Sequence, residues 1–287
     1  APGILSASTA AEMTELYWMA LLRDVPIAGF AADPHVAKAV TDIKKSFSTA
    51  LQEDKTEGAL TLGRDLPRAT SGNLDISEQT LFRCGFKDED RGPLISQFFL
   101  HDVPFGVQLI QLDEFPYAEG RNYLTSYEDW ILAQNTGKDK YGKDYGQCNF
   151  YADDPSYYAA NRRKISTIRD LARFVNRDAL HQAYFNAALF LDAINAPVDA
   201  GNPYRGNLYS RETGFGTLGG PDLLTLVSEV ASRALKIIWR QKWLVHRRCR
   251  PEVYGGLMQM QFLGLDPDGK GIQKHNYGLP AWVATTD

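Results

Sequence analysis

Apolar side chains recur every three or four residues in several stretches of the chain, the spacing that places them on one face of an α-helix. The pattern predicts helices over residues 10–23, 35–51, 127–136, 166–176, 178–195 and 221–248. Capping and stop signals agree, because Asp33-Pro34 precedes the second stretch, Gly137 follows the third and Pro251 follows the last. Residues 94–100 are an apolar run that fits a helix or a strand. The pattern therefore predicts a mostly helical domain.

Polar segments rich in Gly and Pro separate these helices. The longest are residues 52–77 and 200–220, and the tail after Gly255-Gly256 is predicted to be loop-like again. Loops of this length often carry function. The chain shows no internal repeat and no low-complexity tract, so residues 1–287 are predicted to form a single, mostly helical region.

Composition narrows the class of protein. The 287 residues are 44% hydrophobic and 23% charged, which is typical of a soluble globular chain. A net charge of −4 and a pI near 5.8 argue against nucleic acid or an anionic membrane as a partner. No apolar run approaches the roughly 20 residues that span a bilayer. The first residues show no basic segment followed by an apolar one, so no signal peptide is visible, and the sequence does not indicate a compartment.

The three cysteines, Cys84, Cys148 and Cys249, are too few and too scattered for a disulfide scaffold or a zinc site. At most one disulfide could form among them. We interpret them as buried free thiols.

Positive charge is concentrated near the end of the last predicted helix. Residues 233–250 contain seven Lys or Arg side chains together with His246, and no Asp or Glu. Within this stretch Lys242 shares a helix face with the apolar residues Leu235, Ile238 and Val245, and Trp239 lies on the same face. A lysine on an inward-facing position must extend its ammonium group to solvent or meet an anion, since burying an unpaired charge is costly.

Arg250 stands eight residues after Lys242 and directly before Pro251. The residue before a proline is pushed out of the helical region, so Arg250 can turn to one side of the helix end. Lys242 as a point charge and Arg250 as a planar fork could then converge on one tetrahedral or trigonal oxyanion. Because a helix C-terminus favours cations, we expect side chains, and not a helix N-terminus, to hold that anion. The alternative is a solvated helix with its cations on one face.

Residues 241–256, with Lys242, Arg250-Pro251 and a following Glu-x-x-Gly-Gly, resemble the first signature of the vanadium-dependent haloperoxidases. The spacing is similar to that of the algal and cyanobacterial bromoperoxidases. Residues 16–26, 92–100, 169–197 and 213–221 resemble the same family in the same order. A Lys…Arg-Pro match alone would be weak, but the collinear set covers nearly the whole chain.

The resemblance implies an all-α, helix-bundle fold of the superfamily shared with the type 2 acid phosphatases. It implies that Lys242 and Arg250 contact the equatorial oxygens of bound vanadate, which is the expected cofactor. The expected reaction is oxidation of bromide by hydrogen peroxide to hypohalous acid, which an organic halogen acceptor consumes. Trp239 is expected to line the halide side of the site, with core packing as the alternative. The family also forms homo-oligomers.

The family's axial histidine, its Ser-Gly-His segment and its second arginine lie downstream of the region that this chain resembles. None of the five histidines, His35, His101, His181, His246 and His275, stands in such a context, so no metal ligand is assigned. We therefore expect an incomplete catalytic domain, inactive alone, that a downstream segment or a second chain completes. The alternatives are a phosphatase of the same superfamily and a structural or assembly subunit.

Two weaker patterns concern a structural calcium ion. Residues 204–212 form a loop that could hold a cation through carbonyl groups and Glu212. Residues 266–269 are similar to the start of a calcium-binding loop but lack its later ligands, so a turn is the favoured interpretation.

Overall fold

The computed structural model describes residues 1–54, 74–83, 93–118, 120–142, 157–205, 211–265, 276–280 and 282–283. Within these residues the α-helices are α1 (Ala7–Leu21), α2 (Pro34–Glu53), α4 (Tyr127–Thr136), α5 (Ile168–Arg177), α6 (Gln182–Ala193), α7 (Gly220–Arg240) and α8 (Pro251–Leu263). Short helical turns are η1 (Phe30–Ala32), η2 (Gln97–Phe99), η4 (Pro203–Arg205) and the π-helix η6 (Gln241–Val245). Strands β1 (Val103–Phe105) and β2 (Gln108–Ile110) form one antiparallel hairpin. The predicted all-α class is confirmed.

The best-predicted helices begin and end at local signals. Asp33 accepts a hydrogen bond from the His35 amide at 2.8 Å, and Pro34 takes the first helical position of α2. Ser126 accepts from the Asp129 amide at the start of α4, and Gly137 ends that helix in the left-handed conformation with φ 69°. These bonds satisfy donors and acceptors that a helix end leaves free.

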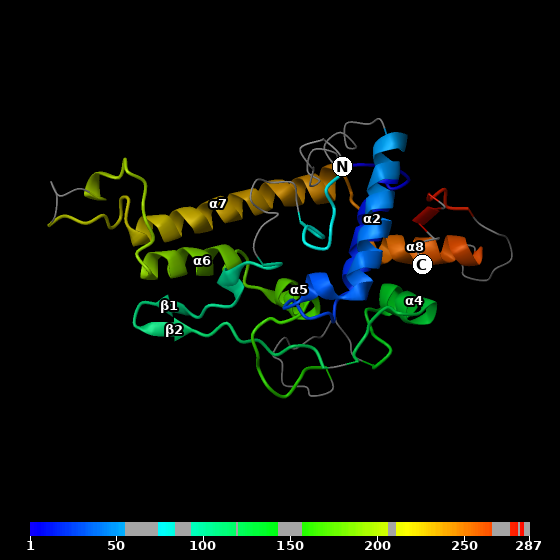
Figure 1. The fold of residues 1–287 in the computed structure, drawn as a ribbon, viewed down its shortest axis with the longest axis horizontal. Helices are drawn as coiled ribbons and strands as arrows, with labels where there is room; N and C mark the ends of the chain where they lie inside the picture. The colour runs from blue at the N-terminus through cyan, green and yellow to red at the C-terminus, as the bar shows by residue number, and fades with distance from the viewer. Residues whose placement is uncertain are drawn as a thin grey trace.

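The main hydrophobic core lies between α1 and α2, which run side by side (Figure 1). Small residues let the two backbones approach closely: Ala11 of α1 and Ala39 and Ala50 of α2 are fully buried. Larger side chains, including Trp18 and Phe47, fill the space around them. α8 packs against α1 of this pair, and η1 packs against α2.

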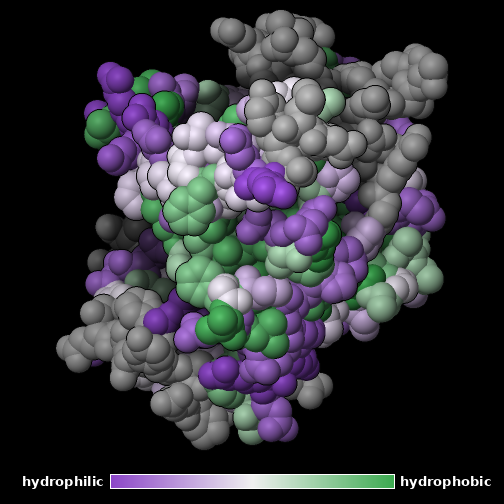
Figure 2. Space-filling view, turned by 90° about the vertical axis from the view of Figure 1, so that its left-hand side faces the viewer, coloured by the Kyte–Doolittle hydropathy of each residue, from purple (hydrophilic) through white to green (hydrophobic). Residues whose placement is uncertain are grey.

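Two groups of helices extend from this pair. α8 contacts both α1 and α4, whereas α6 and α7 lie against each other on the other side of the molecule, next to the β1–β2 hairpin (Figure 1). α7 is the longest helix, and none of its residues is buried by the described part of the chain. Apolar side chains such as Leu226 and Ile237 are more than half exposed. Figure 2 faces the side with the hairpin and shows hydrophobic side chains gathered in its centre.

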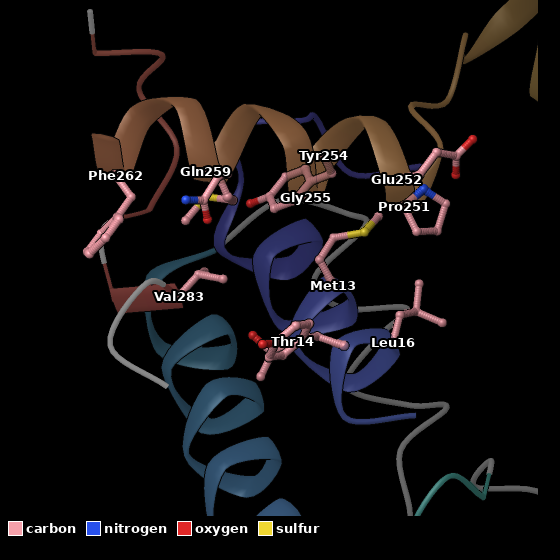
Figure 3. A pocket seen from close by; sticks show the side chains of 12 residues that line it. Met13, Thr14, Leu16, Pro251, Glu252, Tyr254, Gly255, Gln259, Phe262 and Val283 are labelled. Carbon is pink, nitrogen blue, oxygen red and sulfur yellow. The ribbon is translucent and has the colours of Figure 1, made fainter. Parts of the chain in front are cut away.

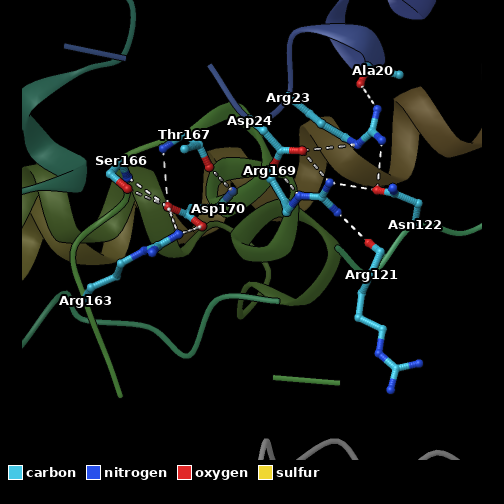
Figure 4. Close-up of polar contacts among 10 residues, drawn as sticks. All are labelled: Ala20, Arg23, Asp24, Arg121, Asn122, Arg163, Ser166, Thr167, Arg169 and Asp170. Atoms are coloured by element: carbon cyan, nitrogen blue, oxygen red, sulfur yellow. Dashed lines mark hydrogen bonds and ion pairs between the residues drawn. The ribbon is translucent and has the colours of Figure 1, made fainter. Parts of the chain in front are cut away.

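A polar network joins α5 to the end of α1 (Figure 4). The fully buried Asp170 carboxylate accepts hydrogen bonds from Arg163 at 2.9 and 3.2 Å and from the amide and hydroxyl of Ser166, both at 3.0 Å. Burial raises the Asp170 pKa, but these donors outweigh it and hold the pKa below its ordinary value. Next to it, the Arg169 guanidinium binds both oxygens of Asp24 at 2.5 and 2.6 Å.

Glu114 is joined to this network through its backbone, which exchanges two hydrogen bonds with the Arg163 backbone, but its Oε1 atom takes no part. Its Oε1 atom is buried and has no hydrogen-bond partner among the described residues. Burial, and then the negative charge of Asp170, raises the Glu114 pKa from 4.5 to about 7, against the opposing charges of Arg173 and Arg163. Near neutral pH this carboxyl group is therefore only partly ionised.

The structure corrects three details of the predicted helices. α8 runs straight through Gly255 and Gly256, where the sequence predicted a loop. The helix predicted over residues 221–248 ends as an α-helix at Arg240 and continues as a π-helix to Val245. The ambiguous run 94–100 contains the short turn η2 and no strand. No helix in the described part of the chain is long and apolar enough to cross a membrane.

Gly256 is a buried residue inside α8, at the point where Trp130 packs against the helix. A Cβ atom at this position would lie 2.2 Å from Cε2 of Trp130, whose indole crosses α8 and donates a hydrogen bond to the Glu252 carbonyl oxygen at 2.8 Å. At Gly255, by contrast, an added Cβ meets no atom within 4 Å. The first glycine faces open space and the second makes room for Trp130.

We predict that Gly256→Ala and Gly255→Ala change stability in opposite directions. Gly256→Ala forces Trp130 or α8 to move and should lower the free energy of unfolding by about 1–3 kcal/mol. Gly255→Ala should raise it by about 0.5–1 kcal/mol, because alanine is the better helix former. Urea unfolding of the two variants measures both effects. Equal effects of the two substitutions would contradict this account of α8.

We also predict a pH-dependent stability difference between the parent protein and Glu114→Gln. With a folded pKa of about 7, above the ordinary 4.5, Glu114 binds its proton more tightly in the folded state than in the unfolded state. The parent should therefore lose stability as pH rises from about 5 to 8, on the order of 1–3 kcal/mol relative to Glu114→Gln, which has no proton to lose. Unfolding curves across this pH range measure the difference. Parallel pH profiles for the two proteins would contradict the assignment.

Candidate oxyanion-binding site

Lys242 lies on an irregular turn at the end of α7. The His246 amide donates to the Gln241 carbonyl oxygen at 2.8 Å, the five-residue spacing of a π-helix. The Arg248 amide then bonds back to the Lys242 carbonyl oxygen at 3.2 Å, with Arg247 between them at φ 47°. We call residues 242–250 the cationic turn. Single π-turns are frequent at functional sites. This one brings the Lys242 carbonyl oxygen to the amide of Arg248, two residues before Arg250.

The Lys242 side chain is half-buried, and its Nζ atom lies 5.1 Å from the centre of the Trp243 ring. An aromatic face at this distance attracts an ammonium group without neutralising it. Within the described residues, Lys242 forms no ion pair with a carboxylate. Its charge is thus free to bind an anion.

The helix face that Lys242 shares is less covered than the sequence predicted. Leu235 is half-buried, but Ile238 and Val245 are 59% and 56% exposed and Trp239 is 54% exposed. The helix that packs against α7 is α6, and it leaves these side chains uncovered. The predicted inward orientation of Ile238 and Val245 is therefore wrong for the described part of the chain. The core-packing alternative for Trp239 finds no support there.

Arg250 leaves the helical conformation as predicted, with φ −78° and ψ 152°, because Pro251 follows it. The structure corrects its setting, however. Arg250 is the N-cap residue of α8, so the cationic turn begins within η6 and ends at the start of α8. The sequence placed Arg250 at a helix C-terminus, whereas the structure places it at the N-terminus of α8, the positive end of that helix dipole. That side chains hold the anion stays a prediction.

Arg250 already has one acidic neighbour. Its Nε atom lies 3.3 Å from Oε1 of Glu252, and both side chains are exposed by more than a third. Such an exposed pair is weak, so an oxyanion can compete with Glu252 for the guanidinium group.

The cationic turn is attached to the scaffold by a second ion pair, between Arg248 and Glu12 of α1. Both side chains are about 30% exposed or less. Neighbouring Glu15 is raised in pKa from 4.5 to about 7, first by burial and then by the charge of Glu12. Near pH 7 the α1 face beside the turn therefore carries less negative charge than its sequence suggests. Nothing in the sequence pairs Glu12 with a residue 236 positions later.

The other polar residues singled out in the sequence lie elsewhere. His101 stacks on Phe190, His181 packs on Phe185, and His35 bonds to its own helix cap. Among the described residues, no three His, Cys, Asp or Glu side chains lie close enough together to hold a metal ion. Cys249 is a half-buried free thiol whose pKa is raised by burial. Cys84, Cys148, His275, residues 266–269 and residues 206–210 of the second calcium candidate lie outside the described residues.

The arrangement fits a tetrahedral or trigonal oxyanion better than a metal cation. Among the described residues, the cationic turn carries an ammonium group without a carboxylate partner, a planar guanidinium group and the N-terminus of α8, and no set of anionic ligands for a metal. Trp239 is near Lys242 in sequence and exposed, so it is available to line such a site.

Comparison with known proteins gives the class first. The second vanadate-dependent bromoperoxidase of Ascophyllum nodosum, described as homohexameric, matches 99% of this chain with a TM-score of 0.70 and 26% sequence identity, over 41% of its own length. The chain thus has the all-α fold of the vanadium-dependent haloperoxidases, as predicted. No protein-family model matches the chain.

Within that class the resemblance is to the bromoperoxidases. The vanadium-dependent bromoperoxidase of Ascophyllum nodosum is 28% identical over 92% of this chain. Those of Corallina pilulifera and Corallina officinalis are both 27% identical over 91% of it. The resemblance predicted from the sequence is confirmed. The chain spans 42–45% of the length of these relatives, less than half.

We predict that Glu252→Gln strengthens oxyanion binding at the cationic turn. The substitution removes a carboxylate that competes for Arg250, so inorganic phosphate should bind the full-length protein about 2–5-fold more tightly at low ionic strength. Calorimetric titration measures the dissociation constant. The matched control is Glu229→Gln, which removes the same charge from an ion pair with Arg233 on α7. If the two variants bind phosphate equally, the turn is not the site.

Proposed function

We propose that this chain supplies one side of the vanadate site of a bromoperoxidase, which oxidises bromide with hydrogen peroxide to hypohalous acid. The observation that carries the proposal is the Lys242 ammonium group, which has no carboxylate partner among the described residues and precedes Arg250, the N-cap of α8, by eight residues. The bromoperoxidase-named relatives, which align over nine-tenths of the chain, support vanadate as the anion.

Each residue has a distinct task in this proposal. Lys242 places a full positive charge near the anion's oxygens, and the Trp243 ring beside its Nζ atom limits where that charge can move. Once the anion has displaced Glu252 from the ion pair, the planar guanidinium group of Arg250 can donate hydrogen bonds to two of the anion's oxygens. Bound vanadate supplies the Lewis acid for peroxide chemistry. Side chains preorganised in this way stabilise the negative charge that develops as peroxide oxygen is transferred to bromide.

We propose that groups outside the described residues complete the site. The chain spans less than half the length of each relative. Among the described residues, no histidine belongs to a group of side chains that could hold a metal ion. We infer that a downstream segment or a second chain supplies the axial histidine and the remaining donors, so that this chain alone is inactive. The homohexameric structural neighbour supports a homo-oligomer as the working form. We also propose that residues 204–212 hold a structural calcium ion.

Trp239 is proposed to line the site on the halide side. Its side chain is more than half exposed and stands one turn before Lys242. An exposed indole next to an oxyanion site offers an apolar, polarisable surface for a weakly hydrated halide.

Two other functions use the same residues. A phosphatase of the superfamily would bind phosphate at the cationic turn, since phosphate and vanadate share tetrahedral geometry. A structural or assembly subunit would use the uncovered α7 surface to pack against other chains. The bromoperoxidase names of the aligned relatives favour the first proposal over both.

We predict that Lys242→Ala abolishes vanadate-dependent bromination by the full-length protein, with a loss of at least about 100-fold, the usual effect of removing a charge-stabilising donor. The matched control is Lys236→Ala, an exposed lysine earlier on the same helix, which should change the rate less than about twofold. The assay follows bromination with bromide, peroxide and added vanadate. Near-normal activity of Lys242→Ala would contradict its role.

The same preparations separate the alternatives. Hydrolysis of a phosphate ester without bromide oxidation would establish the phosphatase. Absence of both activities in the full-length protein, with the assembly intact, would favour the role of a structural or assembly subunit.

A further inference from the structure

A groove lies between α1 and α8, beside the cationic turn. Its volume is about 400 Å³, within the size range of small-molecule pockets. Figure 3 shows Met13 and Thr14 of α1 below it and Tyr254 and Gly255 of α8 above it. Residues far apart in the sequence thus build one concave surface.

The lining of the groove is mainly apolar. Thioether and aromatic side chains dominate it: Met13, Tyr17, Met258 and Phe262. Thioethers and aromatic rings pack well against flat organic molecules. Among the described lining residues the only charged side chain is Glu252, which is paired with Arg250. The groove therefore favours a neutral ligand over an ion.

Gly255 keeps the groove open. Its position on α8 lines the groove, and a Cβ built there meets no atom within 4 Å. Helix packing does not require a glycine here, unlike at Gly256, where Trp130 leaves no space. A side chain at position 255 would instead occupy volume that a ligand can use.

One end of the groove adjoins the candidate oxyanion site. Pro251 and Glu252 line that end, and Arg250 directly precedes them (Figure 3). Gln259 and Phe262 lie toward the other end of α8 and offer an amide and an exposed ring. A molecule in the groove can thus be held at its far end while its near end approaches the cationic turn.

We propose that this groove binds the organic halogen acceptor, a neutral aromatic molecule of one or two rings with a single hydrogen-bonding group. This inference rests on the proposed bromide oxidation. In the reaction, a ring carbon forms a bond to bromine as the O–Br bond of hypobromous acid breaks. The ring proton then leaves with the hydroxide as water.

The test uses 2-naphthol as the probe and the full-length protein. Fluorescence titration without peroxide gives its dissociation constant, and bromination at varied 2-naphthol gives KM. Gly255→Leu fills the groove while improving helix propensity and should raise both constants at least tenfold. Phe262→Ala removes an exposed wall and should raise both constants about threefold. The matched control, Gly216→Leu, adds the same side chain at another open glycine, outside the groove, and should change neither.

Unchanged 2-naphthol constants in Gly255→Leu and Phe262→Ala overturn the proposal, as do equal changes in Gly216→Leu. The proposed function is tested separately, by tribromide formation in the parent protein without 2-naphthol. If tribromide forms but the groove variants bind 2-naphthol normally, the groove assignment alone fails. If no tribromide forms, the halide chemistry fails and the acceptor assignment with it.

Discussion

The extended backbone that Pro251 imposes on Arg250 is the constraint on which the candidate site depends. Helical structure has already ended at Val245, and Arg247 has a positive φ of 47°, so the chain reaches Arg250 as an irregular segment. The extended conformation of Arg250 then sets where the next helix can begin. With it, the chain leaves the cationic turn in an extended conformation, and a new helix starts at Pro251 with Arg250 as its N-cap. Arg250 thus stands at the N-terminus of α8, eight residues after Lys242, and α8 packs against α1 and α4.

The scaffold holds this turn through charges as well as through apolar packing. Arg248 is tied to Glu12 of α1, and the segment that follows α1 is joined to α5 by the bidentate pair of Asp24 and Arg169. At the start of α5, the buried Asp170 carboxylate receives enough donors to remain ionised. Glu114, which lacks such donors, shows the opposite behaviour in the same surroundings. Hydrogen-bond donors therefore decide which buried acids keep their charge.

The sequence predicted those parts of the fold that depend on neighbours along the chain. α2 and α4 were located correctly, since Asp33, Pro34 and Gly137 act within a few residues of themselves. α8 was missed because two adjacent glycines usually break a helix. The reason for one of them is the indole of Trp130, which lies 126 positions away in the chain. No local pattern contains that contact.

The candidate site divides in the same way. The extended conformation of Arg250 followed from its neighbour Pro251, and the charge-rich stretch was visible directly. The π-turn at Lys242, the α8 N-terminus and the anchoring by Glu12 could not be predicted, because each depends on chain geometry or on a distant partner. The roles of Lys242, Arg250 and Trp239 remain predictions.

The exposure of α7 has a consequence for the site at its end. Its 21 residues form a rod about 31 Å long. In proteins, most of the stability of a helix comes from packing of its apolar face against other elements. α6 packs against it, and no α7 side chain is buried by the described residues. The amide hydrogens of α7 should therefore exchange with solvent at a low local opening free energy until another surface covers them. Since η6 continues α7 directly, the order of that helix and the preorganisation of Lys242 are thermodynamically linked. Whatever covers α7 also tightens the oxyanion site, and an anion bound there in turn slows the opening of α7.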